Sequence, residues 1–233
     1  MVDKQKSIGM LSEQLPQGIM RLQTKGIGIV EAEFEDGSIY TGKMIDQMKN
    51  GEGKLVFKNG EVFEGNFRDD KMHGYGKYKG DKLEYDGDWD SGLQNGNGIE
   101  TWQDGSVYKG AFLDGVKHGQ GVYSWFDGAK YEGEWQHGTI NGFGIFNFKN
   151  GSVYKGFWLD GKRHGKGEFV NKKGQVYMGD FVNDKKEGKG TLTFSNKQKY
   201  VGEFLNNKPH GEGVLSSQDG NSIKGVWQNG EMI

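Results

Sequence analysis

The sequence contains no cysteine, only two prolines, and no apolar run long enough to cross a bilayer. Without cysteine the chain has no thiol nucleophile, and the absence of a charged-then-apolar signal segment at its start favours a reducing cytoplasmic or cytoskeletal setting. Net charge is also small, because 30 basic residues offset most of the 32 acidic ones and leave -2. No general field therefore draws the chain to nucleic acid or to an acidic membrane, and any electrostatic contact must be local.

Hydrophobic residues are scarce as well, at 33% of the chain, whereas glycine occurs 42 times. This composition excludes a thick hydrophobic core. The apolar content is concentrated in 14 phenylalanines, 10 tyrosines and 6 tryptophans, each of which covers a large area. We therefore expect a thin structure held together by repeated aromatic contacts.

A motif of a tyrosine, any residue and a glycine recurs every 23 residues, with a single spacing of 22. Such a period over almost the whole chain indicates one small unit stacked end to end. A second aromatic residue follows the glycine by two positions in nearly every copy, so all three residues lie on one face of a strand. The copies are Tyr40-Thr41-Gly42, Phe63-Glu64-Gly65, Tyr85-Asp86-Gly87, Tyr108-Lys109-Gly110, Tyr131-Glu132-Gly133, Tyr154-Lys155-Gly156, Tyr177-Met178-Gly179, Tyr200-Val201-Gly202 and Ile223-Lys224-Gly225.

A Gly-x-Gly motif, such as Gly119 and Gly121, follows each of these strands after a short polar loop and begins a second strand. Glycine is normally unfavourable inside a strand, so its regular use predicts that a ring from the neighbouring strand packs on it. Asp-Gly and Asn-Gly pairs such as Asn150-Gly151 predict tight hairpins that lead to the next repeat. The predicted fold class is all-β, an elongated single antiparallel meander of about 18 strands.

The repeat resembles the membrane occupation and recognition nexus (MORN) repeat, most clearly in the segments beginning Tyr108-Lys-Gly-Ala-Phe-Leu-Asp-Gly and Tyr154-Lys-Gly-Phe-Trp-Leu-Asp-Gly. The resemblance extends from about Gly28 to Trp227, with eight full repeats and a partial repeat at each end. It implies an elongated, groove-forming sheet used for protein interaction, scaffolding, dimerisation or association with lipid head groups. We assign residues 26–233 to this array and residues 1–25 to an N-terminal segment or cap.

Chains made almost only of such repeats resemble radial spoke head proteins and other axonemal components of cilia and flagella. The resemblance therefore implies a non-enzymatic scaffold and protein-interaction module of an axonemal assembly, with other proteins bound as extended peptides. Lipid kinases and a lysine methyltransferase of the family carry a catalytic domain after the repeats, and we expect none after Ile233. The alternatives are a peripheral membrane tether that binds anionic phospholipids and a regulatory partner of a lipid-modifying enzyme.

Several patterns that suggest ligand chemistry have a structural interpretation instead. Gly-x-Gly opens no helix and lacks a nucleotide lysine, and the acidic residues at 86–90 already fit a strand better than a calcium loop. Histidines recur in alternate repeats, about 19 Å apart, which is too far for one metal, so we expect them to hydrogen bond their own turns as asparagines do elsewhere. We predict no enzyme activity, metal or cofactor. The histidines are His73, His118, His164 and His210, and the asparagines are Asn50, Asn95 and Asn141.

Three surfaces are candidate contact sites. The aromatic face is the predicted protein-binding groove, because a single sheet leaves it open unless its own twist or a partner covers it. It comprises Tyr85, Trp89, Tyr108, Phe112, Tyr131, Trp135, Tyr154, Trp158, Tyr177, Phe181, Tyr200 and Phe204. A basic edge, which is either solvated or a contact for acidic proteins or head groups, comprises Lys71, Lys117, Lys162, Arg163, Lys185, Lys186 and Lys208. The last strand offers an edge for strand addition or homodimerisation at Ile223, Gly225 and Trp227.

Some repeats depart from the pattern. Glu100 interrupts the apolar row, Asn171 stands where other repeats have an aromatic residue, and residues 195–198 lack the turn glycine. Arrays of this kind tolerate single weak units, so drift explains these departures. The alternative is that these repeats are softer or contact a partner.

Overall fold

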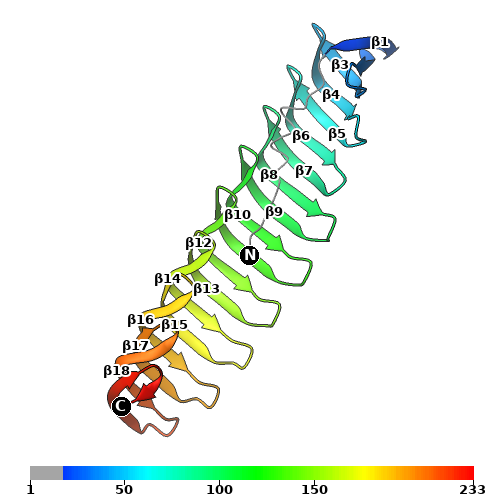
Figure 1. Ribbon diagram of the computed structural model, residues 1–233. Coiled ribbons are helices and arrows are strands. Elements are labelled where there is room, and N and C mark those ends of the chain that lie inside the picture. The colour runs from blue at the N-terminus through cyan, green and yellow to red at the C-terminus, as the bar shows by residue number, and fades with distance from the viewer. Residues whose placement is uncertain (1–17) are drawn as a thin grey trace. The chain divides into compact units, whose positions relative to one another are not determined.

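The computed structural model describes residues 18–233, which form strands and turns and contain no helix. Twenty strands follow one another in chain order (Figure 1). They belong to two compact units that divide between Phe126 and Asp127, and within each unit consecutive strands pair antiparallel. The predicted all-β class and antiparallel meander are confirmed.

The first unit contains ten strands. They are β1 (Ile19–Gly26), β2 (Ile29–Phe34), β3 (Ile39–Ile45), β4 (Met48–Val56), β5 (Val62–Arg68), β6 (Lys71–Lys79), β7 (Leu83–Asp90), β8 (Leu93–Trp102), β9 (Val107–Leu113) and β10 (Val116–Ser124). Most of β1 lies in the segment predicted as a cap, and it pairs with β2 through Leu22 opposite Ala32. The rest of that segment, residues 1–17, lies outside the described residues.

The second unit also contains ten strands. They are β11 (Lys130–Gln136), β12 (Thr139–Asn147), β13 (Val153–Leu159), β14 (Lys162–Val170), β15 (Val176–Val182), β16 (Lys185–Thr193), β17 (Lys199–Leu205), β18 (Lys208–Ser216), β19 (Ser222–Gln228) and β20 (Glu231–Met232). The two strands beyond the predicted number are β1 and the short β20.

Two kinds of turn alternate along each unit, and the predicted tight hairpins are the longer kind. The loop at Asn150-Gly151 uses residues 148–152, closed by the Phe148 amide, which donates to the Ser152 carbonyl at 2.8 Å. The two-residue turns lie at the other end of the strands, as at Asp160-Gly161, where φ is 49° and 73°. Two positive φ values suit the twist of paired strands. We call the two ends the long-loop edge and the tight-turn edge.

The residues before each Gly-x-Gly are therefore strand and not a polar loop, which corrects the prediction. β14, for example, begins at Lys162, directly after its turn. The sequence signal was present, because Asp160-Gly161 is itself an Asp-Gly pair.

The rings of successive hairpins pack edge to face in a column. Tyr154 lies 5.0 Å from Trp158 of its own strand and 5.1 Å from Phe181 of the next hairpin, between ring centroids. Tyr177 repeats the pattern with Phe181 and Phe204, at 5.2 and 4.8 Å. Such pairs stabilise a fold beyond the area that they bury. We call the side of the sheet that carries these rings the inner face and the opposite side the outer face.

The glycines hold the rings, as predicted. Gly156 of β13 lies opposite Gly167 of β14. A Cβ on Gly167 would lie 2.5 Å from the Tyr154 hydroxyl oxygen, and one on Gly156 would lie 2.6 Å from it. The ring thus crosses a pair of glycines on two strands, where any side chain would displace it.

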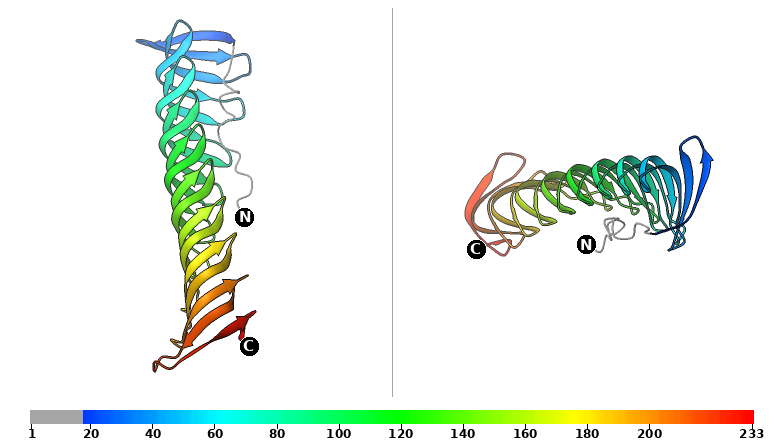
Figure 2. Two further views of the ribbon diagram at one scale, coloured as in Figure 1. Left: turned by 90° about the vertical axis from the view of Figure 1, so that its left-hand side faces the viewer. Right: turned by 90° about the horizontal axis from the view of Figure 1, so that it is seen from above.

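A bulge follows each pair of glycines. Gly165 has a φ of 65°, and the register shifts there, from Gly156 opposite Gly167 to Trp158 opposite Arg163. Bulges bend strands, and Figure 2 shows strands that are arched and not flat. At the shift, the Phe157 carbonyl accepts a hydrogen bond from the Tyr154 hydroxyl at 2.8 Å. The same bond, from tyrosine to the third residue after it, is made by Tyr40, Tyr85, Tyr108, Tyr131, Tyr177 and Tyr200.

Candidate interaction surfaces

The predicted aromatic groove is not an exposed surface. All twelve of its side chains are buried, and the most accessible of them, Trp158, is only 7% exposed. The rings cover one another and the glycines, so they hold the fold together. The prediction that the side chains of Tyr85, Trp89, Tyr108, Phe112, Tyr131, Trp135, Tyr154, Trp158, Tyr177, Phe181, Tyr200 and Phe204 lie open to a partner is wrong.

The predicted basic edge divides between the two faces of the sheet. Its exposed members are the first residues of their strands, namely Lys71, Lys162, Lys185 and Lys208. Lys117, Arg163 and Lys186 stand one residue further along and therefore belong to the inner face. The prediction of a single row of seven exposed cations is wrong, because alternate residues of a strand face opposite sides.

Lys117 forms a buried ion pair with Glu100. Its Nζ lies 2.8 Å from Glu100 Oε2, and the Gln94 side-chain amide donates to Glu100 Oε1 at 3.0 Å. Lys117 Nζ also lies 4.7 Å from the centroid of the Trp102 ring. Burial lowers the pKa of Lys117, and the charge of Glu100 opposes that shift. Glu100 is therefore the partner of a buried cation, and period-two counting from both strands puts the two residues on the same face.

Arg163 and Lys186 occupy the equivalent position in the second unit. The Arg163 Nε donates to Asp184 Oδ1 at 3.0 Å, and its guanidinium lies 5.8 Å from the Tyr154 ring centroid. Lys186 Nζ lies 4.9 Å from the Tyr177 ring centroid, and burial followed by the charge of Arg163 lowers its pKa. These cations pack on the aromatic column and are only partly exposed.

The prediction that the histidine and asparagine side chains hydrogen bond their own turns holds at Asn141, whose Oδ1 accepts the Gly142 amide at 3.2 Å, and is wrong for Asn50, Asn95 and His73. Asn50 accepts the Asp69 amide at 3.2 Å, and Asn95 Nδ2 lies 3.3 Å from Asp114, in each case in the next hairpin. His73 Nδ1 lies 2.9 Å from Asp90 Oδ1. Nδ1 of His164 is buried without a hydrogen-bond partner among the described residues. These side chains lie between successive hairpins, and residues 18–233 contain no cluster of three histidines or carboxylates able to hold a metal ion.

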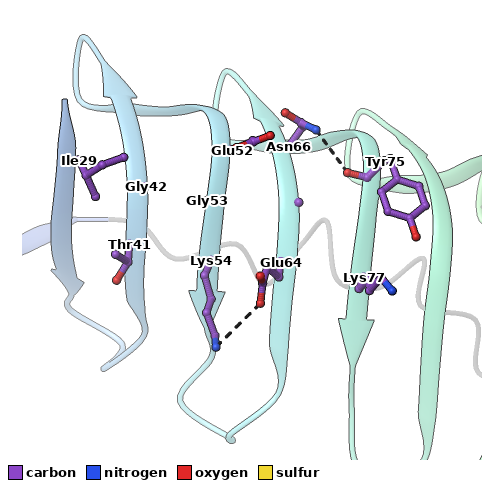
Figure 3. Close-up of a pocket in the computed structure, with 11 residues that line it drawn as sticks. Ile29, Thr41, Gly42, Glu52, Gly53, Lys54, Glu64, Asn66, Tyr75 and Lys77 are labelled. Carbon is purple, nitrogen blue, oxygen red and sulfur yellow. Dashed lines mark hydrogen bonds and ion pairs between the residues drawn. The ribbon is translucent and has the colours of Figure 1, made fainter. Parts of the chain in front are cut away.

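The outer face of the first unit contains a hollow of about 520 Å³ (Figure 3). Gly53 and its neighbours on adjacent strands contribute backbone, and charged side chains stand around them. Lys54 lies 4.0 Å from Glu64, and Lys77 pairs with Asp86 at 2.9 Å. Ile29 and Tyr75 also line the hollow, the Tyr75 hydroxyl donates to Asp86, and the charges around the hollow largely compensate one another.

The corresponding row on the outer face of the second unit has an uncharged stretch, with Glu168 before it and Lys224 after it. This stretch crosses four strands in register and consists of Met178, Thr191, Val201 and Val214. Met178 is 54% exposed and Val201 is 46% exposed. We call this the outer apolar row. The sequence signal for this row is the middle residue of Tyr-x-Gly, which is Met178 or Val201 in two repeats and is charged in most others.

The predicted free edge of β19 is partly occupied. Trp227 lies opposite Met232 of β20, and the Ile233 amide donates to the Val226 carbonyl at 2.9 Å. Trp227 is therefore unavailable for strand addition, which corrects that part of the prediction. Ile223 and Gly225 precede this pairing, and their use as an edge stays a prediction. Residues 18–233 include no helix that is long and apolar enough to cross a membrane.

A sequence-family profile described as MORN repeat matches eight segments of the chain. They are residues 40–62, 63–82, 85–107, 108–130, 131–153, 154–176, 177–199 and 200–222. No curated protein sequence matches the chain significantly.

Solved structures with a similar arrangement share little sequence with this chain. The TCP10 domain of Danio rerio CPAP, in complex with a peptide of STIL, is 15% identical and has a TM-score of 0.46, covering 89% of this chain and 99% of that one. The SAS-4 (dCPAP) TCP domain of Drosophila melanogaster, in complex with a proline-rich motif of Ana2, is 16% identical with a TM-score of 0.34, covering 79% and 90%. Virginiamycin B lyase from Staphylococcus aureus is 12% identical with a TM-score of 0.17, covering 90% and 69%.

Proposed function

Since the chain belongs to the MORN repeat family, we propose that it is a non-enzymatic scaffold that holds extended segments of other proteins on the outer face of its sheet. On the inner face the aromatic rings are buried against one another, and buried cations such as Lys117 pack on them. The observation that carries the proposal is the outer apolar row, because Met178 and Val201 are exposed in it and exposed apolar patches mark binding surfaces. The row crosses four strands, roughly 14 Å, which suits a short stretch of extended chain.

The proposal includes a place for the scaffold in the cytoplasm or cytoskeleton, in a ciliary or flagellar axonemal assembly such as the radial spoke head. It is supported by the resemblance between axonemal components and chains built almost only of MORN repeats. Affinity isolation of the tagged chain from ciliated cells tests it. Axonemal proteins in the eluate are the expected result, and a lipid kinase without axonemal proteins would favour the regulatory alternative.

A double substitution in the outer apolar row tests the surface itself. Met178→Lys with Val201→Lys is compatible with the fold, because Lys109 and Lys155 occupy the same position in other repeats. We expect the variant to lose most of the partner proteins that the unchanged chain recovers. Thr41→Lys, at the same position in the first unit, is the matched control and should recover them fully. Equal recovery by all three chains would refute the assignment of this row.

The membrane alternative and homodimerisation have separate tests. Flotation with vesicles that contain anionic phospholipid should leave the chain unbound, whereas salt-sensitive binding to them would support a membrane tether. Removal of residues 221–233 should lower the oligomeric state in solution if β19 pairs with a second copy.

A further inference from the structure

We propose that the long-loop edge of the second unit binds an acidic, extended segment of a partner protein. Three consecutive loops of this edge, with the strand residues beside them, carry the proposal, at 147–153, 170–176 and 193–199, and the loop after them contains Asp219. The three segments contain five lysines and neither aspartate nor glutamate. The lysines are Lys149, Lys172, Lys173, Lys197 and Lys199. The proposal rests on the scaffold function, because it specifies the chemistry of one partner segment, but it uses a different surface from the outer apolar row.

All five lysine side chains are exposed. Carboxylates in this unit pair with other lysines, as Asp180 does with Lys166 at 2.7 Å and Glu212 with Lys224 at 3.7 Å. Between residues 148 and 199 the chain has 12 basic and 5 acidic residues, so the surrounding charge adds to that of the loops. The three loops differ from the long loops of the first unit, which carry acidic residues such as Asp36, Glu61 and Asp104, and from the loop that follows them, which carries Asp219.

The spacing of the loops fits an extended chain. Strands β12 to β17 pair in sequence, so successive loops are two strands, or about 9.6 Å, apart. An extended segment in the polyproline II conformation rises about 3.1 Å per residue with three residues per turn, so every third side chain lies on the same side and meets a new loop. Carboxylates at every third position of the partner would each reach one loop.

The loop side chains favour a protein over the other polyanions. Lipid surfaces bind protein edges best when an apolar side chain enters the headgroup region, and these segments expose no large apolar side chain. Single-stranded nucleic acid requires exposed rings for base stacking, whereas the aromatic side chains of these loops, Phe148 and Phe194, are partly buried. The row of lysine side chains is therefore best suited to pair with the carboxylates of an extended peptide.

Lys197 adds a second observation. Its φ is 69°, a region that favours glycine, and the other two loops have Gly151 and Gly174 at this position. The third loop thus keeps a lysine at a backbone position where glycine would be less strained. A binding role explains this choice, since observed strain of this kind concentrates at functional positions.

The test uses the full chain and a fluorescent 12-residue peptide with glutamate at every third position, separated by serine and glycine. The triple variant Lys149→Gln, Lys172→Gln, Lys197→Gln should bind the peptide about tenfold more weakly at low salt, because three exposed ion pairs are lost. The matched control is Lys162→Gln, Lys185→Gln, Lys208→Gln, which removes three exposed lysines at the tight-turn edge. It should bind like the unchanged chain, and equal loss in both variants would overturn the proposal.

Further arms separate the alternatives. A peptide of the same composition with contiguous glutamates should bind more weakly, and equal binding would refute the spacing. Stronger binding to phosphatidylserine vesicles or to a single-stranded oligonucleotide than to the peptide would refute the partner class. The Met178→Lys, Val201→Lys variant should retain peptide binding, so failure of the outer apolar row and failure of this edge give different results.

Lys197→Gly should raise Tm by about 2 °C while weakening peptide binding two- to threefold. A rise in Tm with unchanged binding would remove Lys197 from the site.

Discussion

Replacing Phe63 by tyrosine should stabilise the first unit. Phe63 is the one aromatic residue of the repeated motif that has no hydroxyl, so the Asn66 carbonyl at its bulge does not receive the hydrogen bond that seven tyrosines make elsewhere. The ring already occupies the same place. It lies 5.1 Å from Phe67 with an interplanar angle of 81°, and Tyr108 lies 5.1 Å from Phe112 at 87°.

The expected gain is that of one intramolecular hydrogen bond, about 0.5–1.5 kcal/mol. Repeat arrays unfold in parts, so a local measurement is more direct than a global melting curve. Hydrogen exchange of the β5–β6 amides should slow by about 2- to 12-fold, which is the same free energy expressed as a ratio.

The control is the reverse change, Tyr85→Phe, which removes a bond of 2.9 Å to the Asp88 carbonyl in the same unit. It should speed exchange in β7–β8 by a similar factor. If Phe63→Tyr leaves exchange in β5–β6 unchanged, or speeds it, the tyrosine hydroxyls do not support the bulges.

Three further predictions follow from the core. Gly167→Ala should destabilise the second unit by about 1–3 kcal/mol in denaturant unfolding, because the new Cβ would enter the space of the Tyr154 ring. Gly26→Ala is the control, since its Cβ would have no atom within 4 Å, and it should change stability by less than about 0.5 kcal/mol. Equal effects would refute the idea that the glycines hold the rings. Lys117→Met should destabilise the first unit by about 3–5 kcal/mol, since it leaves the buried Glu100 without its cation. Adding Glu100→Tyr should restore most of the lost stability, because other repeats have methionine and tyrosine at these two positions. Failure of the second change to restore stability would contradict the ion-pair account. Burial raises the pKa of the column tyrosines, to about 12 for Tyr154, so the folded state keeps its protons while the unfolded chain loses them above the ordinary pKa of 10.0. Their contribution to stability is therefore complete below pH 10 and declines as pH rises from there. Thermal unfolding followed by circular dichroism between pH 8 and 12 should show a falling Tm. A constant Tm over that range would show that the rings are not buried.

The 23-residue period was enough to predict the strands, the antiparallel meander and the glycine sockets. These features are local or involve adjacent strands, so one repeat already contains the residues that make them. Tyr154, Gly156 and Gly167 lie within 14 positions of one another, and their contact follows from pairing two neighbouring strands. Repetition then extends the same contact along each unit.

Which side chains remain available to a partner was decided by tertiary packing. The arched strands bury the rings that appeared to form an open groove, and they divide adjacent residues such as Lys162 and Arg163 between solvent and the aromatic column. The lysines of the long-loop edge are visible in the sequence as separate residues, 23 or more positions apart from one loop to the next. They form a row only because successive hairpins stack two strands apart, which brings distant loops to the spacing of an extended chain.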